Sequence, residues 1–76
     1  MTVDDRLNAI FRKAFNVERL SEEASPATVG GWDSMGHLSL ITELEAQFSI
    51  QLTVQEWREM VSVRAIKEVL GERGIR

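Results

Sequence analysis

Apolar residues recur at intervals of three and four positions along most of this 76-residue chain, and no segment shows the alternation that is typical of a strand. A residue that favours helix starts precedes each periodic stretch, and glycine, proline or polar segments separate the stretches. The sequence therefore predicts an all-α fold with three longer helices and one short helix. A chain of this length forms one domain, which we assign to residues 1–76.

The first helix is expected to begin at Thr2, whose spacing to Asp5 fits a capping box. Its inward face is predicted to consist of Val3, Leu7, Ile10, Phe11, Ala14 and Phe15. Residues 16–33 then form a long connection, because they lack a period and contain proline and paired glycines. Leu20 and Val29 are its expected anchors, and a short helical turn is compatible with residues 21–24.

The second helix is predicted to span residues 34–48 after Asp33, a favoured N-cap. Leu38, Ile41, Leu44 and Phe48 recur along it at helical spacing. Ile50 and Leu52, in the connection that follows, are expected to reach the core.

Two further cap signals predict the remaining helices. Thr53 and Glu56 fit a second capping box, which introduces a short helix carrying Val54, Trp57 and Met60. Ser62 can cap a last helix that fades at Gly71 and Gly74. Its inward residues are predicted to be Val63, Ile66, Val69 and Leu70.

Charge and composition exclude several classes of function. Twelve acidic and nine basic residues give a formal net charge of −3, which argues against nucleic-acid binding and favours a basic partner. The absence of cysteine excludes disulfides and thiolate metal sites. No apolar run approaches the ~20 residues that span a bilayer, and the start of the chain is acidic rather than basic. We expect a cytoplasmic monomer that binds neither membrane nor metal.

Ser34 is the residue to which the sequence draws most chemical attention. It follows Gly30-Gly31-Trp32-Asp33 and stands at the predicted start of the second helix. The first turn of a helix has unsatisfied N–H donors and partial positive charge, so it suits an anion such as a phosphodiester. This environment favours a phosphate-linked group on the Ser34 hydroxyl.

Two other hypotheses compete for Ser34. In a non-catalytic helical interaction module, Ser34 would be only a helix cap or a phosphorylation site. A hydrolytic triad of Asp33, Ser34 and His37 is a poorer hypothesis, because Trp32 stands where a nucleophile elbow requires glycine and a helical chain lacks the sheet that supports such an elbow. We therefore expect no enzymatic activity.

Asp33-Ser34-Met35 resembles the Asp-Ser-Leu prosthetic-group motif of acyl and peptidyl carrier proteins, with Met35 in place of leucine. The similarity covers nearly the whole chain, from the long first connection to the last helix. It includes Leu38, Leu40, Ile41, Leu44, Glu45, Phe48, Ile50, Leu52 and Val63. The resemblance implies a right-handed four-helix bundle of acyl-carrier-protein type, with a long loop after the first helix and a short third helix.

The resemblance also implies a function. Ser34 would carry 4′-phosphopantetheine, donated by coenzyme A and attached by a phosphopantetheinyl transferase that needs magnesium. Asp33 would support the metal site of that transferase besides capping its own helix. The thiol of the arm would hold an acyl or aminoacyl group as a thioester, supplied by a loading enzyme and passed to downstream enzymes of a fatty acid, polyketide or peptide pathway. The protein would be a carrier, not a catalyst.

The chain departs from the family pattern along the second helix. Gly36 and Ser39 stand where fatty-acid carriers often have acidic residues, and Thr42 replaces an apolar contact residue. The residues that remain candidates for partner binding are Met35, Glu43 and Glu45. A thin acidic face weakens long-range steering, which favours a specialised, free-standing carrier over a general fatty-acid carrier.

Four more side chains have less specific signals. Trp32 is expected to pack as a local anchor, and His37 is expected to be exposed. Trp57 and Met60 are expected in the core or at its rim. If cargo lies between the helices, these two residues with Leu38 and Ile41 are candidate cavity walls.

Overall fold

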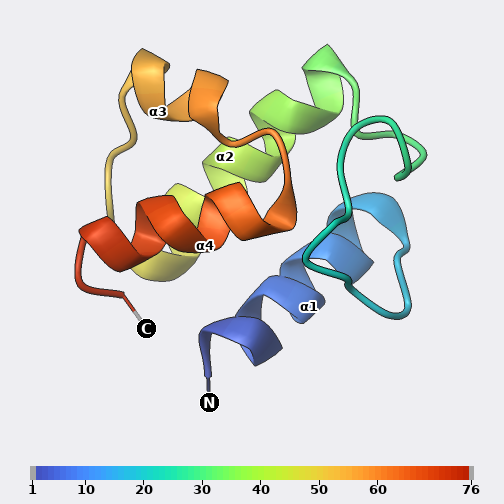
Figure 1. Ribbon diagram of the computed structural model, residues 1–76, viewed down its shortest axis with the longest axis horizontal. Helices are drawn as coiled ribbons and strands as arrows, with labels where there is room; N and C mark the ends of the chain where they lie inside the picture. The colour runs from blue at the N-terminus through green and yellow to red at the C-terminus, as the bar shows by residue number, and fades with distance from the viewer. Residues whose placement is uncertain (1, 76) are drawn as a thin grey trace.

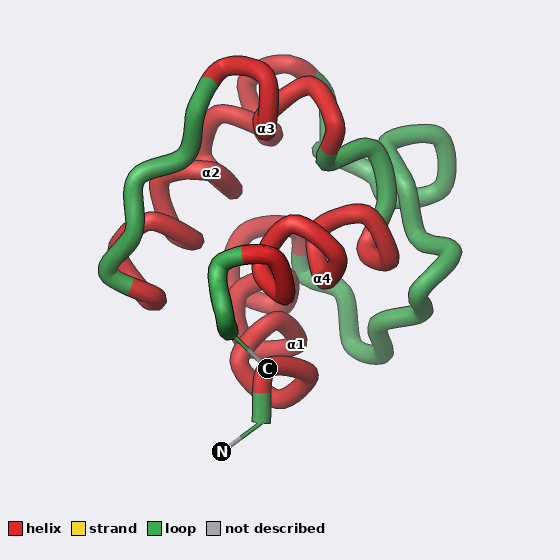
Figure 2. Tube along the Cα trace, turned by 60° about the vertical axis from the view of Figure 1, so that its left-hand side comes forward, coloured by secondary structure: helices red, strands yellow, loops and turns green. Residues whose placement is uncertain are grey.

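A computed structural model describes residues 2–75, and within that range the chain forms four α-helices and no strand (Figure 1). These helices are α1 (Val3–Phe15), α2 (Ser34–Phe48), α3 (Val54–Glu59) and α4 (Val63–Glu72). The connection between α1 and α2 runs over one side of the helical core (Figure 2). The prediction of an all-α fold with a long first connection and a short third helix is confirmed.

Local side-chain hydrogen bonds set the predicted helix starts. The hydroxyls of Thr2 and Thr53 accept from backbone N–H groups three residues later, each at 3.1 Å, and both capping boxes are complete. Ser62 caps α4 in the same way, with Oγ 3.1 Å from the accepted N–H. Asn16 and Ser49 end α1 and α2 in the left-handed region, at φ 58° and 54°. The predicted caps at 2, 53 and 62 are therefore confirmed.

The core is entirely apolar within the described residues. It consists of Val3, Leu7, Ile10, Phe11, Trp32, Leu40, Ile41, Leu44, Leu52, Met60, Val63, Ile66, Val69 and Leu70. The predicted inward face of α4 is correct throughout. On α1, Ala14 is exposed, so it was wrongly placed on the inward face. On α3, Val54 is 58% exposed.

The inward stripe of α2 differs from the predicted one. Leu38 is 47% exposed, whereas Leu40, Ile41 and Leu44 are fully buried. A helix turns by about 100° per residue, so Leu38 lies about 160° around the helix from Leu40 and about 120° from Leu44, outside the stripe that these two residues define. The same stripe extended one turn back passes through His37, which turns this polar residue toward the interior.

The long connection is held by both apolar and polar contacts. Leu20 and Val29 pack against the core, as predicted. The N–H of Ala24 donates to the carbonyl of Ser21 at 3.0 Å, which forms the predicted turn. The carbonyl of Ala24 in turn accepts from the N–H of Val63 at 3.0 Å, so the connection supplies an acceptor to the first turn of α4.

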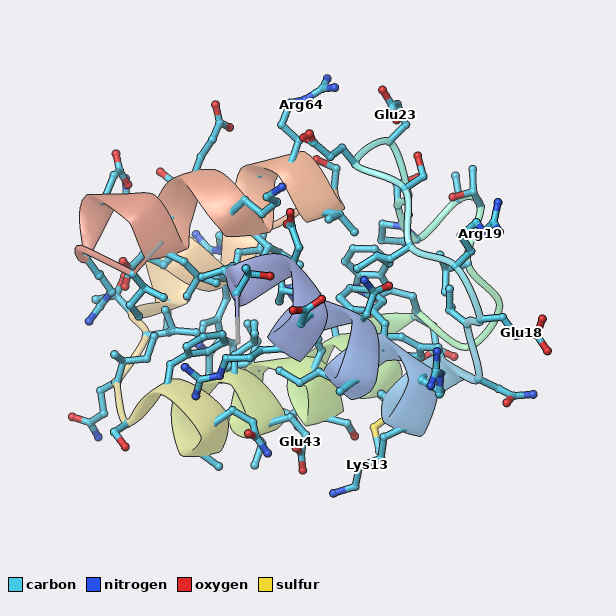
Figure 3. The ribbon with its side chains drawn as sticks, turned by 90° about the horizontal axis from the view of Figure 1, so that it is seen from below. Lys13, Glu18, Arg19, Glu23, Glu43 and Arg64 are labelled. Carbon is cyan, nitrogen blue, oxygen red and sulfur yellow. The ribbon has the colours of Figure 1, made fainter. Side chains whose placement is uncertain are left out.

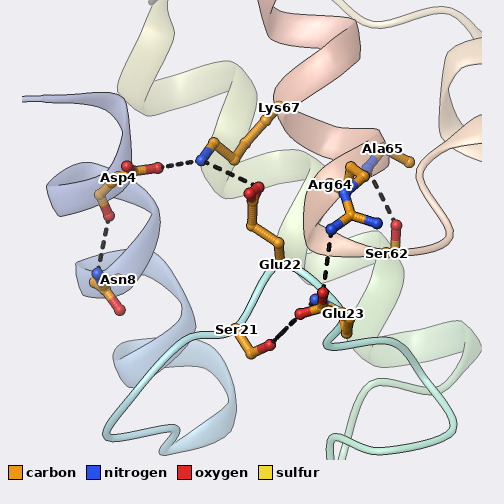
Figure 4. Close-up of polar contacts among 9 residues, drawn as sticks. All are labelled: Asp4, Asn8, Ser21, Glu22, Glu23, Ser62, Arg64, Ala65 and Lys67. Atoms are coloured by element: carbon orange, nitrogen blue, oxygen red, sulfur yellow. Dashed lines mark hydrogen bonds and ion pairs between the residues drawn. The ribbon is translucent and has the colours of Figure 1, made fainter.

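Ion pairs reinforce this attachment (Figure 4). Lys67 on α4 lies 2.7 Å from Asp4 on α1 and 3.8 Å from Glu22 on the connection. The hydrogen bond to Asp4 raises the pKa of Lys67. Arg64 lies 3.1 Å from Glu23, at the outer edge of the molecule (Figure 3). Three separate segments are thus joined, and the path of the connection toward α2 is fixed.

Candidate functional site

Asp33 caps α2 and leaves the neighbouring hydroxyl free. Its Oδ1 accepts from the N–H of Gly36 at 2.9 Å, and its backbone carbonyl accepts from the N–H of His37 at 2.7 Å. Ser34 is the first residue of α2 and is exposed. Within residues 2–75 its hydroxyl takes part in no side-chain hydrogen bond. The cap is therefore Asp33, and the alternative in which Ser34 serves as the cap is wrong.

Two glycines bring the connection close against the first turn of α2. Gly31 has φ +86°, a conformation that glycine adopts without steric cost. A Cβ atom at Gly36 would collide with the carbonyl of Gly31 and with the ring of Phe15. Position 36 therefore has a packing reason to be glycine, independent of any role in partner binding.

Trp32 anchors the segment that leads to Ser34. Only 1% of its surface is exposed. Its ring lies 5.2 Å from that of Phe11 in an edge-to-face arrangement and 6.0 Å from that of Phe15 in a stacked one, measured between centroids. The predicted anchoring role of Trp32 is confirmed. Because Ser34 follows two residues later, its backbone is held from the inside while its side chain faces outward.

His37 is half-buried and connects three segments, so the expectation that it is exposed is wrong. Its Nδ1 accepts from the indole N–H of Trp32 at 2.9 Å, and its Nε2 lies 2.9 Å from the carbonyl of Trp57 on α3. An indole N–H can only donate and a carbonyl can only accept. Nδ1 must therefore be unprotonated, and Nε2 carries the proton that it donates to Trp57. We call this pair of hydrogen bonds the His37 bridge.

A cleft of 460 Å³ opens beside Ser34, between the connection, the start of α2 and α3. Its lining includes Ser34, Trp32, His37, Trp57, Arg58 and Met60. The predicted cavity walls Trp57 and Met60 do line it, whereas Leu38 and Ile41 do not. Leu38 instead faces a shallow groove with Ala14 of α1 and Thr42. The indole N–H of Trp57 is buried and has no hydrogen-bond partner within residues 2–75.

The three candidate partner-binding residues lie in different settings. Met35 is 75% exposed and directly follows Ser34. Glu43 lies 3.3 Å from Lys13 of α1 (Figure 3), and Glu45 accepts from the N–H of Leu52 at 2.8 Å. At 1.5 Å per residue, the two glutamates are about 13 and about 16 Å along the helix from Ser34. Only Met35 is therefore brought together with the hydroxyl.

Neither metal ligands nor membrane-spanning segments add to this site. In the part of the chain that the structure describes, no group of three or more histidine, aspartate or glutamate side chains could hold a metal ion. No helix among residues 2–75 is long and apolar enough to cross a membrane.

Comparisons with known proteins place the fold. No protein-family model matches the sequence, and no curated protein matches it. Among solved structures, the chain is similar to a Mycobacterium tuberculosis protein provisionally named an acyl carrier protein, with a TM-score of 0.81 and 21% identity, covering 92% of this chain and 96% of the other. It is also similar to the holo acyl carrier protein of Geobacter metallireducens, with a TM-score of 0.82 and 28% identity, covering 95% and 85%.

Both similarities extend over nearly the whole chain and include all four helices. The class that the fold defines is therefore the acyl-carrier-protein type of four-helix bundle. The resemblance of this sequence to the acyl carrier protein family is confirmed by its structure.

Proposed function

We propose that this protein is an acyl carrier in which Ser34 bears a 4′-phosphopantetheine arm. The arm is attached from coenzyme A by a separate phosphopantetheinyl transferase, and its thiol holds an acyl or aminoacyl group as a thioester. The observation that carries the proposal is the exposed hydroxyl of Ser34 at the capped start of α2, in a fold shared with acyl carrier proteins. Among residues 2–75 this hydroxyl has no side-chain hydrogen-bond partner. One of those similar proteins is a holo form.

The residues around Ser34 fit such an arm. The first turn of α2 has no acidic side chain, so its free N–H groups and partial positive charge are available to a phosphodiester. The carboxylate of Asp33 already accepts the N–H of Gly36, and Arg58 lies on the far side of the cleft. The chain has no cysteine, so the arm supplies the only thiol that could form a thioester.

Apolar contact is the favoured mode of partner docking. Met35 and Leu38 are exposed beside Ser34, where a transferase or an acyl-transfer enzyme must approach. Glu43 is paired with Lys13, and Glu45 is bonded to a backbone N–H, so α2 presents little free negative charge. We infer that partners recognise Met35 and Leu38 first, with Glu43 and Glu45 as secondary contacts. Asp33 would also support the magnesium site of the transferase.

This surface favours a specialised carrier with dedicated partners over a general fatty-acid carrier. Steering by charge acts over about a Debye length of ~8 Å at physiological salt, and it needs unpaired charges. Ser39 and Thr42 are uncharged positions on the outer face of α2. Arm attachment should therefore depend only weakly on ionic strength.

Intact mass measurement tests the proposal. The full chain is incubated with coenzyme A, magnesium and a broad-specificity phosphopantetheinyl transferase, and the expected product carries a single arm. Ser34→Ala should take up no arm. Ser39→Ala is the matched control, because Ser39 is an exposed serine on the same helix, and it should be modified like the wild type. A folded wild type that accepts no arm from several transferases would support the interaction-module alternative instead.

A further inference from the structure

One half of the His37 bridge, the hydrogen bond from Nε2 of His37 to the carbonyl of Trp57, is the only hydrogen bond between α2 and α3 within the described residues. The most extensive helix contacts are those of α1 with α2 and of α3 with α4. His37 spans this junction at the point where the cleft beside Ser34 opens. His37 therefore joins α2 directly to α3 at the cleft.

The bridge also satisfies a group that α3 leaves unsatisfied. The last carbonyls of a helix lack intrahelical donors, and α3 ends at Glu59, two residues after Trp57. The carbonyl of Trp57 receives only a long contact from the N–H of Met60, at 3.4 Å, besides the His37 hydrogen bond at 2.9 Å. Loss of His37 would therefore weaken the end of α3 as well as the cleft.

Protonation acts on one half of the bridge. A proton on Nδ1 of His37 would face the indole N–H of Trp32, and two donors cannot form a hydrogen bond. Trp32 cannot turn away easily, because it is fully buried against Phe11 and Phe15. The imidazole must therefore move instead, which separates it from the ring on which it is stacked at 6.2 Å.

Few charged side chains lie near His37 in the cleft. The charged side chains that line the cleft with His37 are Asp33 from the connection and Arg58 from α3, one of each sign. The residues that α1 presents to Trp32 are aromatic, and neither α1 nor α4 contributes a charged side chain to the cleft lining.

We propose that His37 is a positioning residue whose charge state controls the cleft beside Ser34. In the neutral form, the His37 bridge holds Trp32 and Trp57 together as opposite sides of the cleft. In the protonated form, the bond to Trp32 is lost while the bond to Trp57 is kept, the imidazole moves away from the Trp32 ring, and the cleft widens on the side of Trp32. The consequence for an arm on Ser34 rests on the proposed carrier function, whereas the bridge itself is a property of the unmodified chain.

The test uses the unmodified full chain and nuclear magnetic resonance. Histidine is the side chain whose charge ordinarily changes between about pH 5 and about pH 8, so the protein is titrated across that range. The indole N–H resonance of Trp32 should shift with the same midpoint as the His37 ring. Quenching of tryptophan fluorescence by acrylamide should rise over the same interval, because the cleft becomes more accessible.

A variant provides the control. His37→Phe keeps an aromatic ring next to Trp32 but forms neither hydrogen bond, so its Trp32 indole resonance should be independent of pH. A wild-type Trp32 resonance that stays constant while His37 titrates would overturn the proposal, even if the variant does not fold. A His37→Phe chain that retains the wild-type titration would also overturn it. Neither result depends on arm attachment, so failure of the bridge and failure of the carrier function are distinguished.

Discussion

The two ends of α2 are held in opposite ways. At its C-terminal end, Ser49 closes the helix in the left-handed conformation, and Glu45 binds the N–H of Leu52. The guanidinium of Arg6 lies 4.1 Å above the ring of Phe48, so α1 also covers this end. At the N-terminal end, Trp32 and its neighbours hold the helix from the core side, Asp33 caps the first turn, and Ser34 and Met35 are exposed.

This difference explains how one helix can both support a small fold and present an exposed hydroxyl. Contacts that hold the N-terminal end pass beneath Ser34 and leave its hydroxyl accessible. At the other end, the carboxylate of Glu45 accepts a hydrogen bond from the N–H of Leu52 and so takes part in holding the fold. The residues of α2 that hold the fold are therefore largely different from the exposed residues around Ser34.

The largest loss of stability is expected from a change in the buried stripe that both ends of α2 share. Leu44 is fully buried at the centre of the inward stripe, so Leu44→Ala should lower the free energy of unfolding by about 2–5 kcal/mol. Such a loss could unfold a domain of this size. Urea denaturation measures it, with the exposed Ser39→Ala as control. An unchanged midpoint in the Leu44 variant would show that the inward stripe is assigned to the wrong residues.

A smaller loss is expected at the N-terminal end alone. Gly36→Ala forces a methyl group against the backbone of Gly31 and should cost about 1–3 kcal/mol. Gly30→Ala is the matched control, since a Cβ there meets no atom within 4 Å and its φ is not positive. Thermal unfolding of both variants checks this. Equal stability of the two would contradict the close approach of the connection to α2.

The caps and the α4 face could be predicted from the sequence because both are local. Thr2, Thr53 and Ser62 bond to backbone groups three residues away, and a helical period is read within one segment. Leu38 was misplaced because a period gives the spacing of a face, whereas neighbouring helices decide which of two adjacent faces is covered. That choice depends on the tertiary arrangement.

The site could be predicted only in part for the same reason. Ser34 and Asp33 form a local pattern, and glycine at 36 inside a helix was a usable signal of close packing. The partners of His37 lie on a connection and on α3, so no pattern around residue 37 predicts them. Glu45 was assigned to partner binding on its charge, and its bond to Leu52 depends on how the chain turns after α2.

The C-terminal end should show a smaller but distinct dependence on Glu45. Glu45→Ala leaves the N–H of Leu52 without its acceptor and should cost about 1–2 kcal/mol. Glu43→Ala breaks an exposed pair with Lys13 and should cost about 0–1 kcal/mol. Chemical denaturation of the two variants compares them. A larger loss of stability for Glu43→Ala than for Glu45→Ala would show that Glu43, and not Glu45, holds the C-terminal end of the helix.

Another small effect lies away from both ends and depends on pH. The hydrogen bond from Arg73, followed by that from the Thr53 N–H, lowers the pKa of Glu56 from 4.5 to about 2. Because the folded-state pKa is depressed, the stabilisation is complete above about pH 4.5 and is lost as the pH falls toward 2. Glu56→Gln should therefore cost roughly 1 kcal/mol at neutral pH and progressively less in acid.

Thermal unfolding of wild type and Glu56→Gln across that acid range measures the difference. A gap between the two proteins that is constant from neutral pH to pH 2 would show that Arg73 does not stabilise the ionised carboxylate.

We propose that the N-terminal end of α2 is the attachment site of the 4′-phosphopantetheine arm and that Ser34 is the one residue modified. Peptide mapping by tandem mass spectrometry, after incubation of the folded chain with coenzyme A and a phosphopantetheinyl transferase, tests it most directly. The predicted result is one arm, located on Ser34. An arm on Ser39, Ser49 or any other hydroxyl, or a folded chain that no transferase modifies, would contradict the claim.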